Sequence, residues 1–290
     1  IQVDAFGRES HRFETPWTIP TPTATSGSHL KLTLDIELQK TAAQAFQGKY
    51  GAVVVMDPRD GAILALVSSP DFNPAMYQKN LTQEKWDDLI NNPFKPLFDK
   101  TTGGAFPPGS IYKPLVALAA LEEGIITPQK TYHCNGSLQL GRDTFHCHRR
   151  HGHGDMSVEE ALVKSCDVFF YHLGLELGAE RLARYARAFG LGSKLGLGLN
   201  QEDSGFIPDR STVKKPQTLR KGDLPNLAIG QGLNLMTPLQ MTSLYASLAN
   251  GGKVWSPLLV SSVINHLGET IFKQKPKLLR TADNISQKNF

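Results

Sequence analysis

Cysteine, long apolar runs and net charge are all scarce in this sequence, and each shortage excludes a class of protein. The 290 residues include three cysteines, an odd number that internal disulfides cannot use up. The longest apolar stretches, such as residues 62–67 and 115–121, are far shorter than the roughly 20 residues that cross a bilayer. A formal net charge of +4, scattered along the chain, gives no reason to expect a nucleic-acid partner.

The N-terminal segment also lacks the marks of a natural start. The chain begins at Ile1 without an initiator methionine, and no basic region leads into an apolar one. Residues 1–30 mix Pro, Thr, Ser and Gly with little periodicity, which is typical of an extended lead-in. We therefore expect a packed domain over residues 31–290 and a chain cut from a longer protein.

Two apolar runs near the start of this domain predict a β-hairpin. Residues 51–56 and 61–67 are rich in Val, Ile, Leu and Ala, and the Pro and Gly within residues 57–61 suit a turn. Because neither run alternates with polar residues, both faces of the sheet should be covered. Helical patterns occur in residues 35–46, 110–123, 168–177, 179–189 and 237–248, and a capping box at residues 157–160 opens another helix. The predicted class is α/β (α+β), with helices flanking an antiparallel sheet.

The most informative residues lie at the start of one predicted helix. Ser110 and Lys113 form an S-x-x-K pattern after a Pro-Pro-Gly turn, and this spacing puts the hydroxyl and the amine on one helix face. A lysine amine can take the proton whose loss makes a serine hydroxyl nucleophilic. The helix N-terminus also favours negative charge on a carbonyl oxygen under attack. The tetrapeptide alone, however, favours an N-cap serine beside a solvated lysine.

The surroundings of this pattern resemble the acyl-serine motif of class B penicillin-binding proteins. Residues 106–114 read FPPGSIYKP, and residues 32–39, LTLDIELQ, resemble the segment before the first strand of their transpeptidase domain. Residues 165–167, SCD, resemble their second motif in the S-x-D form typical of penicillin-binding protein 2, and residues 229–232, IGQG, resemble a turn before a late helix. The resemblance covers most of the chain from about residue 30 onward.

This resemblance implies the penicillin-binding transpeptidase fold, with a helical subdomain, and a peptidoglycan D,D-transpeptidase of cell elongation and rod shape. Ser110 would attack the penultimate D-alanine carbonyl of a stem peptide with Lys113 as general base, and β-lactams would trap the acyl-enzyme. Ser165 would relay a proton to the leaving amine, and Asp167 would orient the relay. On sequence alone, Ser165 and Asp167 could instead cap the helix that begins near Val168.

The family also implies a place in the cell and a set of partners. An N-terminal anchor and a pedestal domain, both absent from this sequence, would hold the domain at the periplasmic face of the bacterial inner membrane. A membrane glycan polymerase and other elongation proteins would be its partners. No Lys-Ser/Thr-Gly motif, the third of the family, follows Gly232, and we expect truncation before the strand that carries it.

All three cysteines lie in one segment with five histidines, which are soft and borderline metal ligands: His133, Cys134, His146, Cys147, His148, His151, His153 and Cys166. Structural zinc takes four tetrahedral ligands, commonly three cysteines and a histidine. Some penicillin-binding protein 2 members carry a metal site in the matching loop, and Cys134, Cys147, His153 and Cys166 align with its ligands. The resemblance thus implies a structural Zn²⁺ that the chemistry itself does not need.

Other readings of these motifs stay open. Two cysteines could pair in an oxidising periplasm, which would leave one buried thiol among surface histidines. A serine β-lactamase or penicillin sensor shares S-x-x-K and would hydrolyse its acyl-enzyme rapidly. A non-catalytic, zinc-stabilised scaffold of the wall-synthesis complex would not be acylated at all. If zinc is present, Cys166 lies between Ser165 and Asp167, and the metal would fix the second motif.

Overall fold

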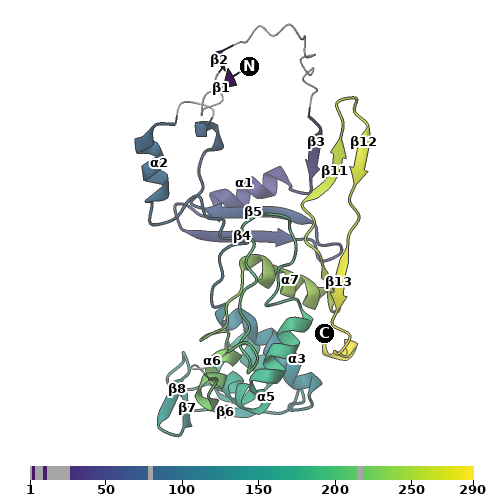
Figure 1. Cartoon of the computed structure of the whole chain (residues 1–290). Helices are drawn as coiled ribbons and strands as arrows, with labels where there is room; N and C mark the ends of the chain where they lie inside the picture. The colour runs from purple at the N-terminus through teal and green to yellow at the C-terminus, as the bar shows by residue number, and fades with distance from the viewer. Residues whose placement is uncertain (1, 4–8, 12–26, 78–80, 214–217) are drawn as a thin grey trace.

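The computed structural model describes residues 2–3, 9–11, 27–77, 81–213 and 218–290 (Figure 1). Most of the predicted lead-in over residues 1–30 lies outside these ranges. Within it, strands β1 (Gln2–Val3) and β2 (Glu9–His11) pair antiparallel. None of the helices in the described ranges is both long and apolar enough to cross a membrane.

The predicted hairpin forms the central sheet. Strands β4 (Gly51–Met56) and β5 (Ile63–Ser69) pair antiparallel, with Val53 opposite Val67. On one face, Val67 packs with Ala42 of helix α1 (Ile36–Gln44). On the other face, Ile63 packs with Leu239 of helix α7 (Pro238–Ala249). Figure 1 shows α1 and α7 on opposite sides of the hairpin, so the predicted cover on both faces is confirmed.

Side-chain caps explain where several helices begin. The Asp35 carboxylate accepts hydrogen bonds from the N–H groups of Glu37 and Leu38 at the start of α1. Capping boxes at Ser157 and Thr237 open helices α4 (Val158–Val163) and α7. These short-range signals are readable in the sequence because donor and acceptor lie within three residues of one another.

A helical body below the sheet holds the largest buried cluster (Figure 1). It consists of α3 (Lys113–Glu122), α4, α5 (Asp167–Ala188) and α6 (Leu224–Ala228). Gly178 has a φ of 74° and breaks the helical path of α5. Glycine adopts a positive φ without strain, whereas other residues rarely do. The prediction of two successive helices is confirmed, because the helical backbone is interrupted at this one residue.

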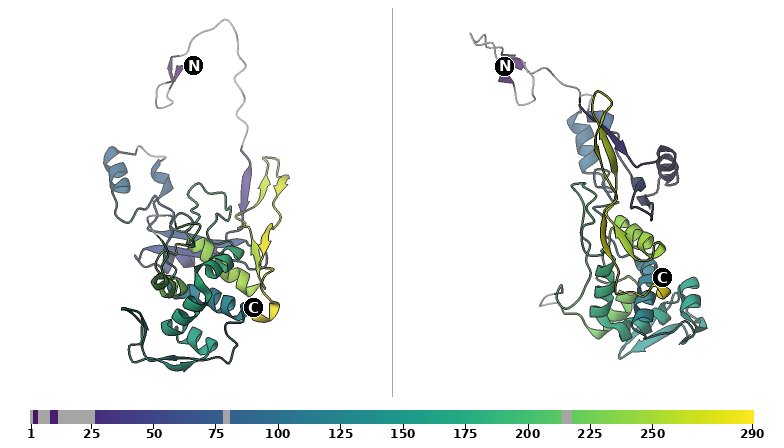
Figure 2. Two further views of the ribbon diagram at one scale, coloured as in Figure 1. Left: turned by 60° about the horizontal axis from the view of Figure 1, so that its bottom comes forward. Right: turned by 90° about the vertical axis from the view of Figure 1, so that its right-hand side faces the viewer.

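The remaining strands join segments that are distant in the chain. Strand β11 (Val260–Ile264) lies between β3 (His29–Leu32) and β12 (Thr270–Lys273), and β10 (Lys253–Trp255) pairs with β13 (Leu278–Thr281). Figure 2 shows the β11–β12 hairpin extending away from the helical body. All pairings between named strands of the described residues are antiparallel, and the predicted α/β (α+β) class is confirmed.

Smaller elements complete the described chain. They are α2 (Gln83–Ile90), the strands β6 (Tyr132–Cys134), β7 (Ser137–Leu140), β8 (Asp143–His146) and β9 (Gly154–Met156), and the 3₁₀ helices η1 (Pro74–Tyr77), η2 (Gly109–Tyr112), η3 (Lys221–Asp223) and η4 (Gln287–Asn289). Strand β6 pairs with β9 and β7 with β8, which folds the cysteine- and histidine-rich segment into two short ribbons.

Candidate functional site

Ser110 lies on the 3₁₀ turn η2, immediately before α3, and its side chain is exposed. The sequence predicted one helix from Ser110 onward, whereas the structure has a tighter first turn. In a 3₁₀ turn, residues i and i+3 lie directly above one another, so Ser110 and Lys113 share a face as predicted. Within the described residues, the Ser110 hydroxyl makes no hydrogen bond, so none joins it to Lys113.

Lys113 is buried and its amine contacts the second motif. The Nζ atom donates to the Ser165 carbonyl oxygen at 2.8 Å, to Ser165 Oγ at 3.0 Å and to Asp167 Oδ1 at 2.7 Å. Three donated hydrogen bonds are the full number available to an ammonium group. The structure therefore brings three of the four predicted catalytic side chains into direct contact, although Lys113 begins α3, Ser165 lies between α4 and α5, and Asp167 begins α5.

Ser165 has a left-handed backbone, with a φ of 50°. It follows the last turn of α4, where its N–H donates to the Leu162 carbonyl and the Cys166 N–H donates to the Ala161 carbonyl. This pair of hydrogen bonds ends many helices, and glycine usually occupies the left-handed position. A serine there is strained, and its hydroxyl is directed to Lys113 by that same backbone conformation.

Asp167 is the first residue of α5, and its carboxylate lies between two partners. Oδ1 pairs with Lys113, and Oδ2 accepts a hydrogen bond of 2.9 Å from the His148 backbone N–H. Burial acts to raise the pKa of this carboxyl, but the hydrogen bond and charge of Lys113, with the His148 N–H, outweigh burial and lower the pKa. The alternative in which Asp167 only caps α5 is wrong, because its side chain faces Lys113 and His148 instead.

The role of His148 as a partner of Asp167 was missed in the sequence. In the sequence, His148 is one of several clustered histidines, and its backbone N–H, which carries no sequence signal, makes the closer contact with Asp167. Its ring Nδ1 lies 3.4 Å from the same carboxylate oxygen. Adjacency to Cys147 is the one feature of the sequence that could have directed attention to this position.

The loop over residues 229–236 positions the turn that carries Ser110. Gly109 N–H donates to the Gly230 carbonyl at 2.9 Å, and Phe106 and Met236 exchange two backbone hydrogen bonds. Gly230 has a φ of 69°, and a Cβ atom there would lie 2.3 Å from the Gly109 carbonyl oxygen. Only glycine allows this close approach. The predicted turn before a late helix is confirmed, since α7 follows at Pro238.

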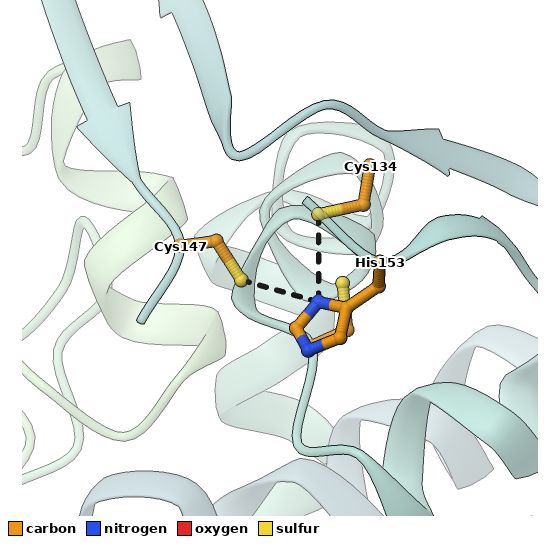
Figure 3. A group of neighbouring side chains, drawn as sticks. Cys134, Cys147 and His153 are labelled. Carbon is orange, nitrogen blue, oxygen red and sulfur yellow. Dashed lines mark hydrogen bonds between the residues drawn. The ribbon is translucent and has the colours of Figure 1, made fainter. Parts of the chain in front are cut away.

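The predicted metal ligands converge at one end of the helical body. One ligand atom from each of Cys134, Cys147, His153 and Cys166 lies within 4.8 Å of the others, and all three cysteines are buried. Figure 3 shows the sulfur atoms of Cys134 and Cys147 directed at His153 Nδ1, each at 3.6 Å. The cysteines are free thiols, so the alternative of a disulfide is not what the structure shows.

This donor set has the chemistry and the spacing of a tetrahedral metal site. Zinc with sulfur at about 2.3 Å and nitrogen at about 2.0–2.1 Å places those two atoms about 3.6 Å apart. Burial raises the pKa of the Cys166 thiol to about 12, so without a cation this group stays protonated. Burial, followed by the charges of His148 and Arg149, lowers the pKa of His153 and favours the neutral ring that binds metals.

Among the other histidines of the segment, His148 borders this set of four, with its Nδ1 3.9 Å from Cys147 Sγ. His133 is exposed, and its Nδ1 lies 2.7 Å from Asp155 Oδ1 across the β6–β9 ribbon. The side chains of His146 and His151 are also exposed. His148, together with Cys147 and Asp167, forms a second, overlapping group, but its carboxylate is already paired with Lys113.

Comparison with known proteins shows that most of the chain is similar to penicillin-binding proteins. The family described as the penicillin binding protein transpeptidase domain matches residues 51–289. A curated relative, peptidoglycan D,D-transpeptidase MrdA of Haemophilus influenzae, is 34% identical over 250 residues, which are 85% of this chain and 38% of the relative. The chain therefore spans about two fifths of that relative's length.

Solved structures of penicillin-binding proteins are also similar. A complex between PBP2 and MreC from Helicobacter pylori contains a chain that is 35% identical with a TM-score of 0.78, over 86% of this chain and 46% of that one. Penicillin-binding protein A from M. tuberculosis, in a penicillin G acyl-enzyme complex, is 29% identical with a TM-score of 0.81, over 91% and 61%. The predicted resemblance and the predicted transpeptidase fold are thereby confirmed. This chain belongs to the penicillin-binding protein transpeptidase domain family.

Proposed function

We propose that this chain is the catalytic part of a peptidoglycan D,D-transpeptidase that cross-links stem peptides during cell elongation. The observation that carries the proposal is the contact of the Lys113 amine with both Ser165 and Asp167, one helical turn from Ser110. A buried amine joined to a second hydroxyl is the arrangement that serine acyl transfer needs for moving a proton away from the nucleophile and back to a leaving group.

In this reaction, Ser110 Oγ attacks the penultimate D-alanine carbonyl while the Lys113 amine takes the hydroxyl proton and becomes the ammonium group that donates to Ser165 and Asp167. The short path from Lys113 Nζ to Ser165 Oγ then carries a proton to the departing terminal D-alanine. Asp167 holds the amine in place through the ion pair. The amine of a neighbouring stem peptide attacks the acyl-enzyme and releases Ser110.

Acylation by penicillin G tests this function. We would incubate the longest natural polypeptide that contains these residues with the drug and measure its intact mass, beside the same protein with Ser110→Ala. We expect a stable single adduct that Ser110→Ala abolishes. The reason is that a β-lactam, like the substrate, forms an ester with the Ser110 hydroxyl. No adduct on a folded, unmutated protein would contradict the proposal.

The same measurement separates the two rival functions. A serine β-lactamase or penicillin sensor with hydrolytic activity would form the adduct and lose it rapidly, with an accumulation of hydrolysed penicillin. A non-catalytic scaffold would give no adduct at all. Following the adduct mass over hours therefore assigns the protein to one of three classes.

We further propose that Cys134, Cys147, His153 and Cys166 bind a structural zinc ion. Support comes from the sulfur-to-nitrogen distances of 3.6 Å and from three buried thiols that have no disulfide partner. When bound, zinc would crosslink the ribbons to the start of α5, and Ser165 and Asp167 flank one ligand directly. It would supply rigidity rather than chemistry.

Metal content tests the zinc site. The protein purified without chelator should carry one zinc ion per chain by elemental analysis, and His153→Gln should lose it and unfold at a lower temperature. His133→Gln is the matched control, because His133 lies in the same ribbons but is exposed and paired with Asp155. Equal zinc content in the two variants would count against the proposed ligand set.

We also propose the periplasmic face of the inner membrane as the location, with elongation proteins and a membrane glycan polymerase as partners. The support is similarity to relatives named peptidoglycan D,D-transpeptidase and to the PBP2 of a PBP2–MreC complex. Binding of a purified MreC homologue to the natural polypeptide, measured by interferometry, tests the partner class. Absence of binding by the folded protein would exclude this partner.

A further inference from the structure

Tyr171 is a buried residue whose hydroxyl has no part in the proposed reaction. It lies on α5 one turn after Asp167, so the two side chains share a helix face. Its ring is 4% exposed and packs against Phe145 of strand β8. Its hydroxyl donates a hydrogen bond of 3.0 Å to the backbone carbonyl of His146, the last residue of that strand.

This hydrogen bond and two others hold the backbone of residues 146–148. The His146 carbonyl accepts from Tyr171, the Cys147 N–H donates to the Gly136 carbonyl at 2.9 Å, and the His148 N–H donates to Asp167. Two of the three partners belong to the first two turns of α5. The segment is therefore fixed to the same helix that carries the carboxylate it contacts.

We propose that Tyr171 is a positioning residue, which holds the backbone of residues 146–148 so that the His148 N–H orients Asp167 toward Lys113. A carboxylate with one oxygen held by a fixed backbone donor has its other oxygen directed at the lysine. The hydroxyl of Tyr171 does not touch the reacting atoms. It holds the His146 carbonyl, which fixes the position of the His148 N–H, and that N–H in turn orients Asp167.

The geometry also gives this contact a function distinct from metal binding. Cys147 is a proposed zinc ligand, but a ligand sulfur fixes a side chain, whereas Tyr171 and Asp167 fix the backbone on either side of it. Both hydrogen bonds are made to backbone groups, and neither is made to a ligand atom. The contact of Tyr171 therefore acts on the backbone of this segment and not on a ligand atom.

Replacing Tyr171 by phenylalanine removes the hydroxyl alone and tests the inference. The inference rests on the proposed function for its kinetic readout. With penicillin G, the first-order acylation step of Tyr171→Phe should slow by about three- to tenfold, the factor that one lost hydrogen bond supplies. The non-covalent binding constant and the zinc content should not change. Amide hydrogen exchange at His148, measured by NMR, should quicken by a similar factor.

Tyr185→Phe is the matched control. Tyr185 lies on the same helix, is 3% exposed and donates its hydroxyl to Glu123, away from the site. Both variants should lose some thermal stability, but Tyr185→Phe should keep the acylation step and the His148 exchange of the unmutated protein. Equal acylation and equal His148 exchange in the two variants would overturn the inference. If the unmutated protein is not acylated, the proposed function fails, and His148 exchange still decides the role of Tyr171.

Discussion

Among single residues, Ser165 has a backbone conformation that serine rarely adopts. It occupies the left-handed position after α4 that glycine fills without strain, at a cost of about 1–3 kcal/mol. The same residue supplies both a carbonyl and a hydroxyl to Lys113. Glycine would relieve the strain at this position, but it could not offer the hydroxyl that Lys113 contacts.

Comparison of Ser165→Gly with Ser165→Ala isolates this strain. Both variants lose the hydroxyl, but only alanine keeps a Cβ atom in the left-handed region. We expect Ser165→Gly to have the higher free energy of unfolding, by about 1 kcal/mol, while both variants lose most acylation by penicillin G. Urea denaturation measures the difference, and a more stable alanine variant would contradict the explanation.

Asp209 links stability to pH in the helical body. The residue is 4% exposed, and its carboxylate accepts hydrogen bonds from Ser211, Arg187 and Thr212. Burial acts to raise its pKa, but these donors outweigh burial and hold the pKa far below the ordinary value. The folded state therefore keeps the carboxylate charged in acid that already protonates the unfolded chain.

The pH dependence of unfolding should reveal this group. Because the pKa is lower in the folded state, the stabilisation is complete above the unfolded pKa of about 3.9 and is lost as the pH falls below that value. The advantage in unfolding free energy of the unmutated protein over Asp209→Asn should be constant above about pH 5 and shrink toward pH 3. Urea titrations across this range measure it, and an advantage that does not change with pH would refute the assignment.

At the scale of elements, the 3₁₀ turn with Ser110 is held by a loop that is distant in the sequence. The Gly230 carbonyl accepts from Gly109, and the Gly230 α-carbon lies against that turn with no room for a side chain. This backbone contact fixes the position of the turn that carries Ser110. The late turn that resembled a family motif therefore has a structural role beside Ser110.

Gly230→Ala tests this contact, with Gly196→Ala as control. Both glycines have a positive φ, but a Cβ at Gly196 meets nothing within 4 Å. We expect Gly196→Ala to lower the free energy of unfolding by about 1 kcal/mol and to leave acylation unchanged. Gly230→Ala should lose more stability and acylate more slowly, because the turn must move. Equal acylation rates in the two variants would argue against this role of the loop.

At the scale of the whole molecule, Thr33 joins three distant parts of the chain. Its backbone N–H donates to the Leu259 carbonyl, and its hydroxyl lies 2.7 Å from the Ile63 carbonyl oxygen and 2.8 Å from that of Leu258. The strand before α1, the central hairpin and the C-terminal strands meet there. Such contacts stabilise the fold only after the whole chain has folded, since they close very long loops.

Thr33→Val should therefore destabilise the protein more than an equivalent change elsewhere. Valine has the same shape but removes the hydroxyl donor from the Ile63 carbonyl oxygen, at a cost of about 1 kcal/mol. Thr144→Val is the control, because the Thr144 hydroxyl contacts Gln139 in an exposed ribbon. Denaturant unfolding compares the two variants. Equal losses of unfolding free energy would show that the hydroxyl of Thr33 contributes no more than that of an exposed threonine.

Local features of the sequence predicted much of the fold. The Asp35 and Ser157 caps, the hairpin over β4 and β5, and the break at Gly178 all depend on residues within a few positions of one another. Hydrogen-bond geometry and backbone sterics act over that distance, so a pattern of residue types predicts them. The pairing of β3 with β11 has no such signal, because the two strands lie more than two hundred residues apart.

By itself, the sequence determined which residue types the site contains: a serine and a lysine one turn apart, a second serine and an aspartate, and three cysteines near a histidine. Tertiary structure alone decided that Lys113 points to Ser165 and Asp167, that Asp167 faces a backbone N–H rather than capping its helix, and that Ser165 adopts a left-handed conformation. The physical reason is that these contacts join separate helices and a ribbon. Their geometry depends on how the core packs those elements, which no local spacing of residues encodes.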